Sequence, residues 1–143
     1  MNKVMSLVEN KTFELFSSFM PRRKEIPHRI GEVVFDVRDY SPDYYRSFSP
    51  ANTFTKWALA EVASIDTLPE GMDSYQLEGG MYAVFKQKGP NKDPNLFRYI
   101  FTQWLPGSNY LLDDRPHFDI LNVGTRKNDP EAEEEIWIPI KSK

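Results

Sequence analysis

The stretch Glu-Glu-Glu-Ile-Trp-Ile-Pro-Ile-Lys at residues 133–141 carries a clear strand pattern. Because side chains alternate between the two faces of a strand, its three isoleucines predict one apolar side that faces a core. Glu135 and Trp137 are two residues apart and therefore share the opposite side. A carboxylate beside an indole suits a cation or an amphipathic small molecule. Taken alone, the strand favours a simpler interpretation, in which Glu135 is solvated and Trp137 covers the sheet.

The length and composition predict one globular domain spanning residues 1–143. The net charge of -3 comes without a continuous basic stripe, which argues against direct nucleic-acid binding. The chain has no cysteine, and its two histidines lack metal-binding spacing, so we expect no disulfide, no thiol catalysis and no metal site. We find no membrane-length apolar run and no signal-peptide pattern, and a cytoplasmic location without membrane contact is the expectation.

Hydrophobic periodicity predicts two helices and a series of strands. One helix begins at Asn10 or Thr12 and places its phenylalanines in the core; the other begins at Asp93-Pro94 and runs to Trp104. Residues 56–63 have helical propensity, but the Thr-Phe-Thr entry favours a strand. The expected strands are residues 3–8, 33–40, 53–65, 74–77, 81–86, 117–122 and 133–141.

The order strand-helix-strand-strand occurs twice, in halves of about residues 1–68 and 69–143. This predicts an α+β fold in which duplicated modules form an antiparallel sheet, with two helices on one face. A ligand cleft is expected between the halves.

The strands expected at residues 117–122 and 133–141 together suggest a ligand-binding site. If Phe118 and Ile120 lie on the isoleucine face, then His117, Asp119 and Leu121 lie on the face of Glu135 and Trp137. Burial of an unpaired carboxylate is costly. For Asp119 we favour a binding role over pairing with Arg115, Lys141 or His117, and for His117 a structural role. By the same parity, Tyr40 and Trp57 are expected to add aromatic rings to this face.

The sequence contains no nucleophile elbow, P-loop or dinucleotide-binding motif, and we predict no catalytic residue.

Several segments in one order resemble the GyrI-like small-molecule effector-binding domains, the ligand-sensing modules of AraC-family and MerR-family transcription regulators. These segments are residues 82–85, 88–90, 104–106, 115–119 and 133–141. Residues 11–24 and 54–62 are similar to the stand-alone, integron-cassette branch of that family. The resemblance covers nearly the whole chain and rests on the series of segments, because no single motif is decisive.

The resemblance implies a multidrug-type pocket that binds lipophilic cations through aromatic stacking and a buried acid. It assigns the pocket acid to Asp119, where the family usually has Glu, and the acid and aromatic residue of the last strand to Glu135 and Trp137. Tyr82, Trp57 and Tyr40 complete the expected ligand-binding set as stacking walls.

The expected function is a stand-alone domain that senses or sequesters a lipophilic or cationic small molecule, without a cofactor. A regulatory role would act through a separate DNA-binding partner, and a homodimer is left open. Two alternatives remain. The first is a hydrolase of reactive toxins that uses the pocket carboxylates. The second is a protein-interaction role like that of a gyrase inhibitor.

Overall fold

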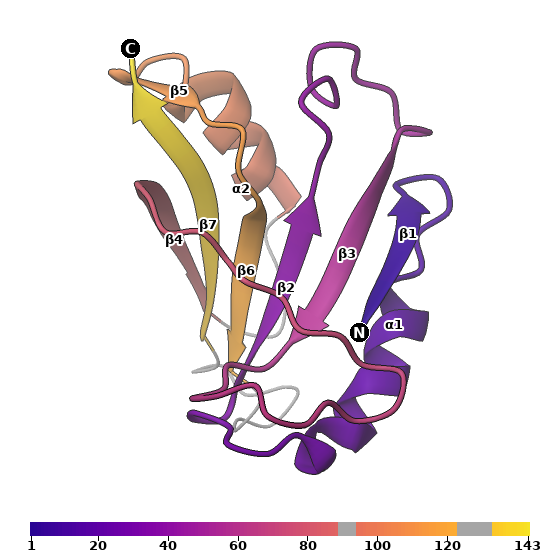
Figure 1. The fold of residues 1–143 in the computed structure, drawn as a ribbon. Coiled ribbons are helices and arrows are strands. Elements are labelled where there is room, and N and C mark those ends of the chain that lie inside the picture. Colours follow the sequence, from indigo (N-terminus) through magenta and orange to yellow (C-terminus); the bar gives the residue numbers. More distant parts are fainter. Residues whose placement is uncertain (89–93, 123–132) are drawn as a thin grey trace.

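The structure, a computed structural model, describes residues 1–88, 94–122 and 133–143. In these residues seven strands form one antiparallel sheet (Figure 1). Its order is β1-β3-β2-β6-β7-β4, and β5 pairs with β7 at the side of this path. The strands are β1 (Asn2–Ser6), β2 (Val33–Asp39), β3 (Thr53–Leu59), β4 (Tyr82–Lys88), β5 (Tyr110–Leu112), β6 (His117–Asn122) and β7 (Glu133–Ser142).

The topology confirms the duplicated α+β architecture. Strands β1, β3 and β2 with helix α1 (Thr12–Phe19) form one module, and β4, β7 and β6 with α2 (Pro94–Tyr99) form the other. The two modules meet where β2 pairs with β6 in the middle of the sheet. The short strand β5 was not predicted, because three residues carry too little periodicity.

Both helices cover the same face of the sheet, which we call the helix face. Leu15 and Phe19 of α1 are buried in one cluster with core residues of β1, β2 and β3. Helix α2 continues as a π-helical turn, η2 (Ile100–Trp104), whose Ile100 is buried against Ile136 and Ile138 of β7. The prediction of an isoleucine core face is therefore confirmed.

The expectation that the phenylalanines of the first helix lie in the core is wrong for Phe13, which is 87% exposed. Leu15 and Phe19 are four residues apart and share the side of α1 that faces the sheet. Phe13 lies two residues from Leu15, where the helical period turns its side chain to another side. After α1 the chain continues as a 3-10 helix, η1 (Met20–Glu25).

Residues 60–81, here called the crossing segment, lead from β3 to β4 across the face opposite the helices (Figure 1). We call that side of the sheet the open face. The strand expected at residues 74–77 is wrong, since no ladder pairs with it in the described chain. Its alternation is nevertheless real: Tyr75 and Leu77 are half-buried, while Ser74 and Gln76 are exposed. The segment lies across the sheet, and one side of it packs there without forming a ladder.

Candidate functional site

The register of the central strands corrects the predicted side-chain parity. Phe118 is the cross-strand partner of Trp137, and Asp119 is the partner of Ile136. Cross-strand partners in an antiparallel pair point to the same face. Asp119 therefore lies on the helix face with the isoleucines, whereas Trp137 lies on the open face. The expectation that Asp119 shares a face with Glu135 and Trp137 is wrong, because the pairing is offset by one residue.

Four of the six predicted site residues lie on the open face. Trp57, Val37, Phe118 and Trp137 are successive register partners in a row across β3, β2, β6 and β7. Within this row the rings of Phe118 and Trp137 stack, with centroids 5.1 Å apart. The ring of Tyr82 meets both rings edge-on, at 5.1 Å and 5.7 Å. The open face thus carries a continuous aromatic wall over the second module.

Glu135 and Trp137 are joined directly. The Trp137 indole Nε1 donates a hydrogen bond of 3.0 Å to Glu135 Oε1, as their shared side of β7 allows. Both side chains are half-buried. Within the described residues this is the one hydrogen bond of the Glu135 carboxylate, and it has no ion pair there. Glu135 is therefore a partly desolvated anion without a close ion pair among the described residues, and the cation nearest to it in register is Lys86, its cross-strand partner on β4.

An apolar cavity of about 300 Å³ lies at the first module, between the sheet and the crossing segment. Its sheet side comes from Phe35, Val37 and Leu59 on the open face and from Ala58 on the helix face, and its cover includes Tyr75 and Leu77. Tyr75 also packs against Trp57, with ring centroids 4.9 Å apart. Cavities of this size and lining commonly bind small organic molecules. Tyr75 was not singled out from the sequence, although its alternation with Leu77 marked one side of the segment as apolar.

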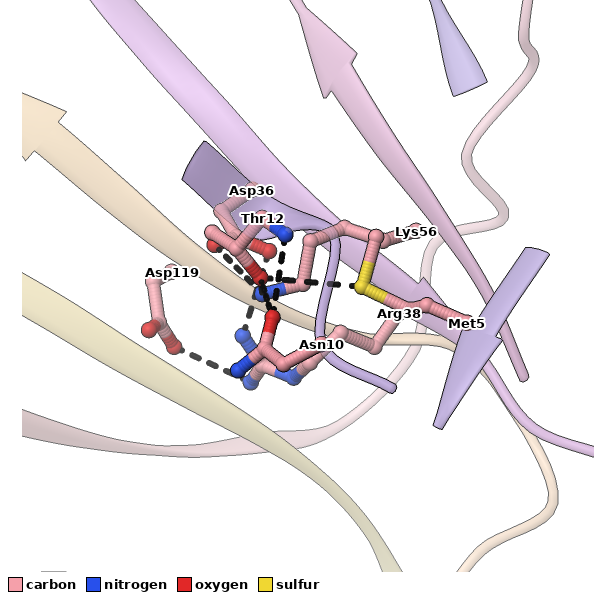
Figure 2. Close-up of polar contacts among 7 residues, drawn as sticks. All are labelled: Met5, Asn10, Thr12, Asp36, Arg38, Lys56 and Asp119. Carbon is pink, nitrogen blue, oxygen red and sulfur yellow. Dashed lines mark hydrogen bonds and ion pairs between the residues drawn. The ribbon is translucent and has the colours of Figure 1, made fainter. Parts of the chain in front are cut away.

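Asp119 belongs to a buried charge cluster on the helix face, which joins the two modules (Figure 2). Arg38 Nη2 donates a hydrogen bond of 3.1 Å to Asp119 Oδ1, and Arg38 Nη1 lies 3.5 Å from Asp36 Oδ1. Lys56 Nζ contacts Asp36 Oδ2 at 3.2 Å and Thr12 Oγ1 at 3.0 Å. The four charged side chains are each 12% exposed or less. Two carboxylates and two cations make this cluster electrically neutral.

Electrostatics in the cluster follow from its burial. Burial lowers the pKa of Lys56, and the charge of Asp36 only partly opposes this effect. Burial is the largest single effect on Arg38 and acts to lower its pKa, but the acidic groups around it, Asp119 foremost, together outweigh burial and raise the pKa. Arg38 and Lys56 were not predicted. The signal for Arg38 was its position two residues from Asp36, on the same side of the strand expected at residues 33–40.

Tyr40, the last of the six predicted residues, lies beside His117 on the helix face. Its ring is edge-on to the imidazole at 5.0 Å, and Tyr45 stacks on the same imidazole at 5.7 Å. Burial and the charge of Arg38 lower the pKa of His117 to about 3, so this side chain is neutral at physiological pH. The three rings line a second cavity of about 230 Å³ between the modules, where Asp113, Asp114, Arg46, Arg115 and Lys141 also contribute.

The expected cleft between the halves thus corresponds to this smaller and more charged cavity, and the larger apolar cavity lies over the first module alone. The structure brings together Glu135, Trp137 and Tyr82, and it places Trp57 at the same face beside the cavity cover. Asp119 and Tyr40 lie on the other face. Their role as ligand contacts stays a prediction.

The described residues lack the features of two other kinds of site. Among the described residues, no group of three or more histidine, aspartate and glutamate side chains could hold a metal ion. In the same part of the chain, no helix has the length and apolar character needed to cross a membrane.

A duplicated α+β domain with an aromatic sheet face and an apolar cavity is typical of small-molecule-binding domains. The comparison with protein families agrees with this class: the family model of the GyrI-like small molecule binding domain matches residues 13–141. The chain therefore belongs to the GyrI-like family. No curated protein matches it.

Proposed function

We propose that this domain binds an amphipathic organic cation on the open face of its sheet. The observation that carries the proposal is that the 300 Å³ apolar cavity is lined by Phe35, Val37 and Leu59, on the same face as the row from Trp57 to Trp137. The apolar part of the ligand enters the cavity, and its charged end lies along the aromatic wall. Aromatic ring faces attract cations through their quadrupoles.

The placement of charge supports Glu135 as the anion that receives the ligand. Phe35 lines the cavity, and Ile120 and then Glu135 follow it as register partners on the next two strands. Glu135 is therefore about 10 Å from the cavity wall, at the usual spacing of neighbouring strands. A molecule of two or three rings spans this distance. Asp119 is a weaker candidate because Arg38 already neutralises it.

In a cell such a domain would sense or sequester a drug or toxin, and any effect on transcription would pass through a separate DNA-binding partner. This role requires selective binding of the cation over a neutral molecule of similar shape. N-methylquinolinium and quinoline form a suitable pair, since at neutral pH they differ by one methyl group and one charge.

Tryptophan fluorescence titration tests the proposal, because Trp57 and Trp137 both lie on the open face. We expect saturable quenching by N-methylquinolinium and weaker binding of quinoline. Glu135→Gln should weaken binding of the cation by about 1 kcal/mol, roughly fivefold in Kd, and leave quinoline binding unchanged. The matched control is Glu134→Gln, which removes the neighbouring carboxylate on the other side of β7.

Asp119→Asn tests the alternative, a ligand site on the helix face. If this variant weakens cation binding while Glu135→Gln does not, the ligand occupies the helix face and the proposed site is wrong. Absence of saturable quenching by either probe would contradict small-molecule binding of this kind at the open face.

A further inference from the structure

The part of the crossing segment above the cavity, residues 73–80, is attached to the rest of the fold in an unusual way. Its beginning is well anchored: Arg22 Nη2 donates to Glu70 O at 2.7 Å, and Met72 is buried with 7% exposure. Its far end is also anchored, since Arg115 Nη2 and Ile140 N both donate to Met81 O, at 2.6 Å and 3.0 Å. Between these anchors, no backbone hydrogen bond joins residues 73–80 to another described residue.

Residues 73–80 are held against the sheet mainly by the side chains on the inward side of the segment. Tyr75 and Leu77 line the cavity, and the Tyr75 ring rests on Trp57. Ser74, Gln76 and Glu78 alternate with them and are exposed. An aromatic contact of this kind adds a modest stabilisation beyond the area it buries. A segment with few buried contacts and no backbone hydrogen bonds opens at low cost compared with a strand.

Glycines lie at the far end of this stretch, at Gly79 and Gly80. Gly79 has no atom within 4 Å of the place where a Cβ would be, so its backbone can rotate without meeting a neighbour. Small residues at the ends of a segment are common hinges in lids, because they absorb changes of φ and ψ.

In the closed position, a hydrogen-bond donor without a partner lies at this hinge. Arg115 Nη1 is buried and has no hydrogen-bond partner among the described residues. This nitrogen lies against Gly80, where a Cβ would collide with it. A buried donor without an acceptor has a cost in free energy. Displacement of Gly80 would expose Nη1 to water and relieve that cost, which lowers the energy of an open state relative to the closed one.

We propose that residues 73–80 are a gate over the apolar cavity, anchored at Met72, with a hinge at Gly79-Gly80 and with the Tyr75–Trp57 contact as its latch. This inference rests on the proposed function, since the gate controls entry to the same cavity. A ligand enters when the segment lifts and Tyr75 leaves Trp57, and closure of the segment then covers the apolar part of the bound molecule.

Stopped-flow quenching by N-methylquinolinium tests the gate, because it measures the association and dissociation rate constants of the probe. Substitutions in a gate change both constants, whereas substitutions in a static wall of the cavity do not change them in the same way. Tyr75→Ala removes the latch and should raise both the association and the dissociation rate constants, by about two- to tenfold. Gly79→Ala fits the closed segment but restricts the hinge, and it should lower both rate constants by about two- to fivefold with little change in Kd. Tyr99→Ala, at an exposed tyrosine of α2, is the matched control and should change neither rate.

The outcomes separate the two proposals. If Tyr75→Ala raises only the dissociation rate and Gly79→Ala changes nothing, Tyr75 is a wall of the site and the gate is wrong, while ligand binding stands. If N-methylquinolinium does not bind at all, the cavity proposal fails and the gate fails with it. Hydrogen exchange in the ligand-free protein gives an independent check: amides of residues 73–80 should exchange much faster than those of β3, and equal protection would overturn the gate.

Discussion

Arg38 of β2 and Asp119 of β6 form an ion pair of 3.1 Å across the central strands, at the place where the two modules meet. Both side chains are about nine-tenths buried. The pair lies between the hydrophobic cluster around α1 and the one around Ile100, so it connects two separate apolar cores. Breaking a buried pair leaves an uncompensated charge in a medium that solvates it poorly.

Loss of the Arg38 side-chain charge should therefore destabilise the fold strongly. We expect Arg38→Met to lower the free energy of unfolding by about 3–5 kcal/mol, because Asp119 and Asp36 both lose a cation. Urea denaturation followed by circular dichroism measures this change. Arg46→Met is the control, since Arg46 and Asp43 form an exposed pair that contributes about 0–1 kcal/mol. A loss below 1 kcal/mol for Arg38→Met would show that the cluster does not hold the modules together.

The two neighbouring glycines at the end of the crossing segment should respond differently to the same substitution. A Cβ on Gly80 would collide with the Arg115 guanidinium, which Asp113, Met81 and Ile140 hold in place. We expect Gly80→Ala to lower the unfolding free energy by about 1–2 kcal/mol, because those hydrogen bonds must shift. Gly79→Ala meets no atom and should be neutral or slightly stabilising. Equal melting temperatures for both variants would contradict this placement of Arg115.

His117 makes the stability of the protein depend on pH. Burial, with the charge of Arg38, lowers its pKa from 6.5 to about 3 in the folded state. Between these values the unfolded chain binds a proton that the folded chain does not, so stability is present above pH 6.5 and falls as the pH drops toward 3. Each pH unit inside this window costs at most about 1.4 kcal/mol.

Urea denaturation at a series of pH values measures this effect. His117→Phe keeps an aromatic ring beside Tyr40 and Tyr45 but cannot titrate, so its stability should fall less steeply between pH 6 and 4, a range chosen inside that window. His28→Gln, at an exposed histidine, is the matched control. Parallel curves for wild type and His117→Phe would mean that His117 is not buried as a neutral group.

The two ends of helix α1 offer a direct test of which side of it faces the sheet. Phe19 is 1% exposed and Phe13 is 87% exposed. Phe19→Ala should cost about 3–5 kcal/mol of unfolding free energy through lost burial and the cavity that it leaves. Phe13→Ala should change it by about 0.5 kcal/mol or less, as is usual for exposed positions. A large loss for Phe13→Ala would indicate that an additional surface covers this residue.

The sequence alone determined the number and order of most elements and the apolar side of β7. These properties follow from local periodicity: the isoleucines alternate, and the same order of strand, helix, strand and strand appears twice. The shared side of Glu135 and Trp137 has the same origin, because residues two apart in a strand always point the same way. The alternation at Tyr75 and Leu77 was visible too, but periodicity cannot tell a strand in a ladder from a segment that lies across a sheet.

Only the tertiary structure decided which side chains from different strands share a face. The offset of one residue between β6 and β7 pairs Phe118 with Trp137, and it moves Asp119 to the helix face. Register depends on hydrogen bonding between segments distant in the chain, and a shift of one residue exchanges the two faces of a strand. For the same reason Arg38 and Lys56, from two other strands, could not be recognised from the sequence as the partners that neutralise Asp36 and Asp119.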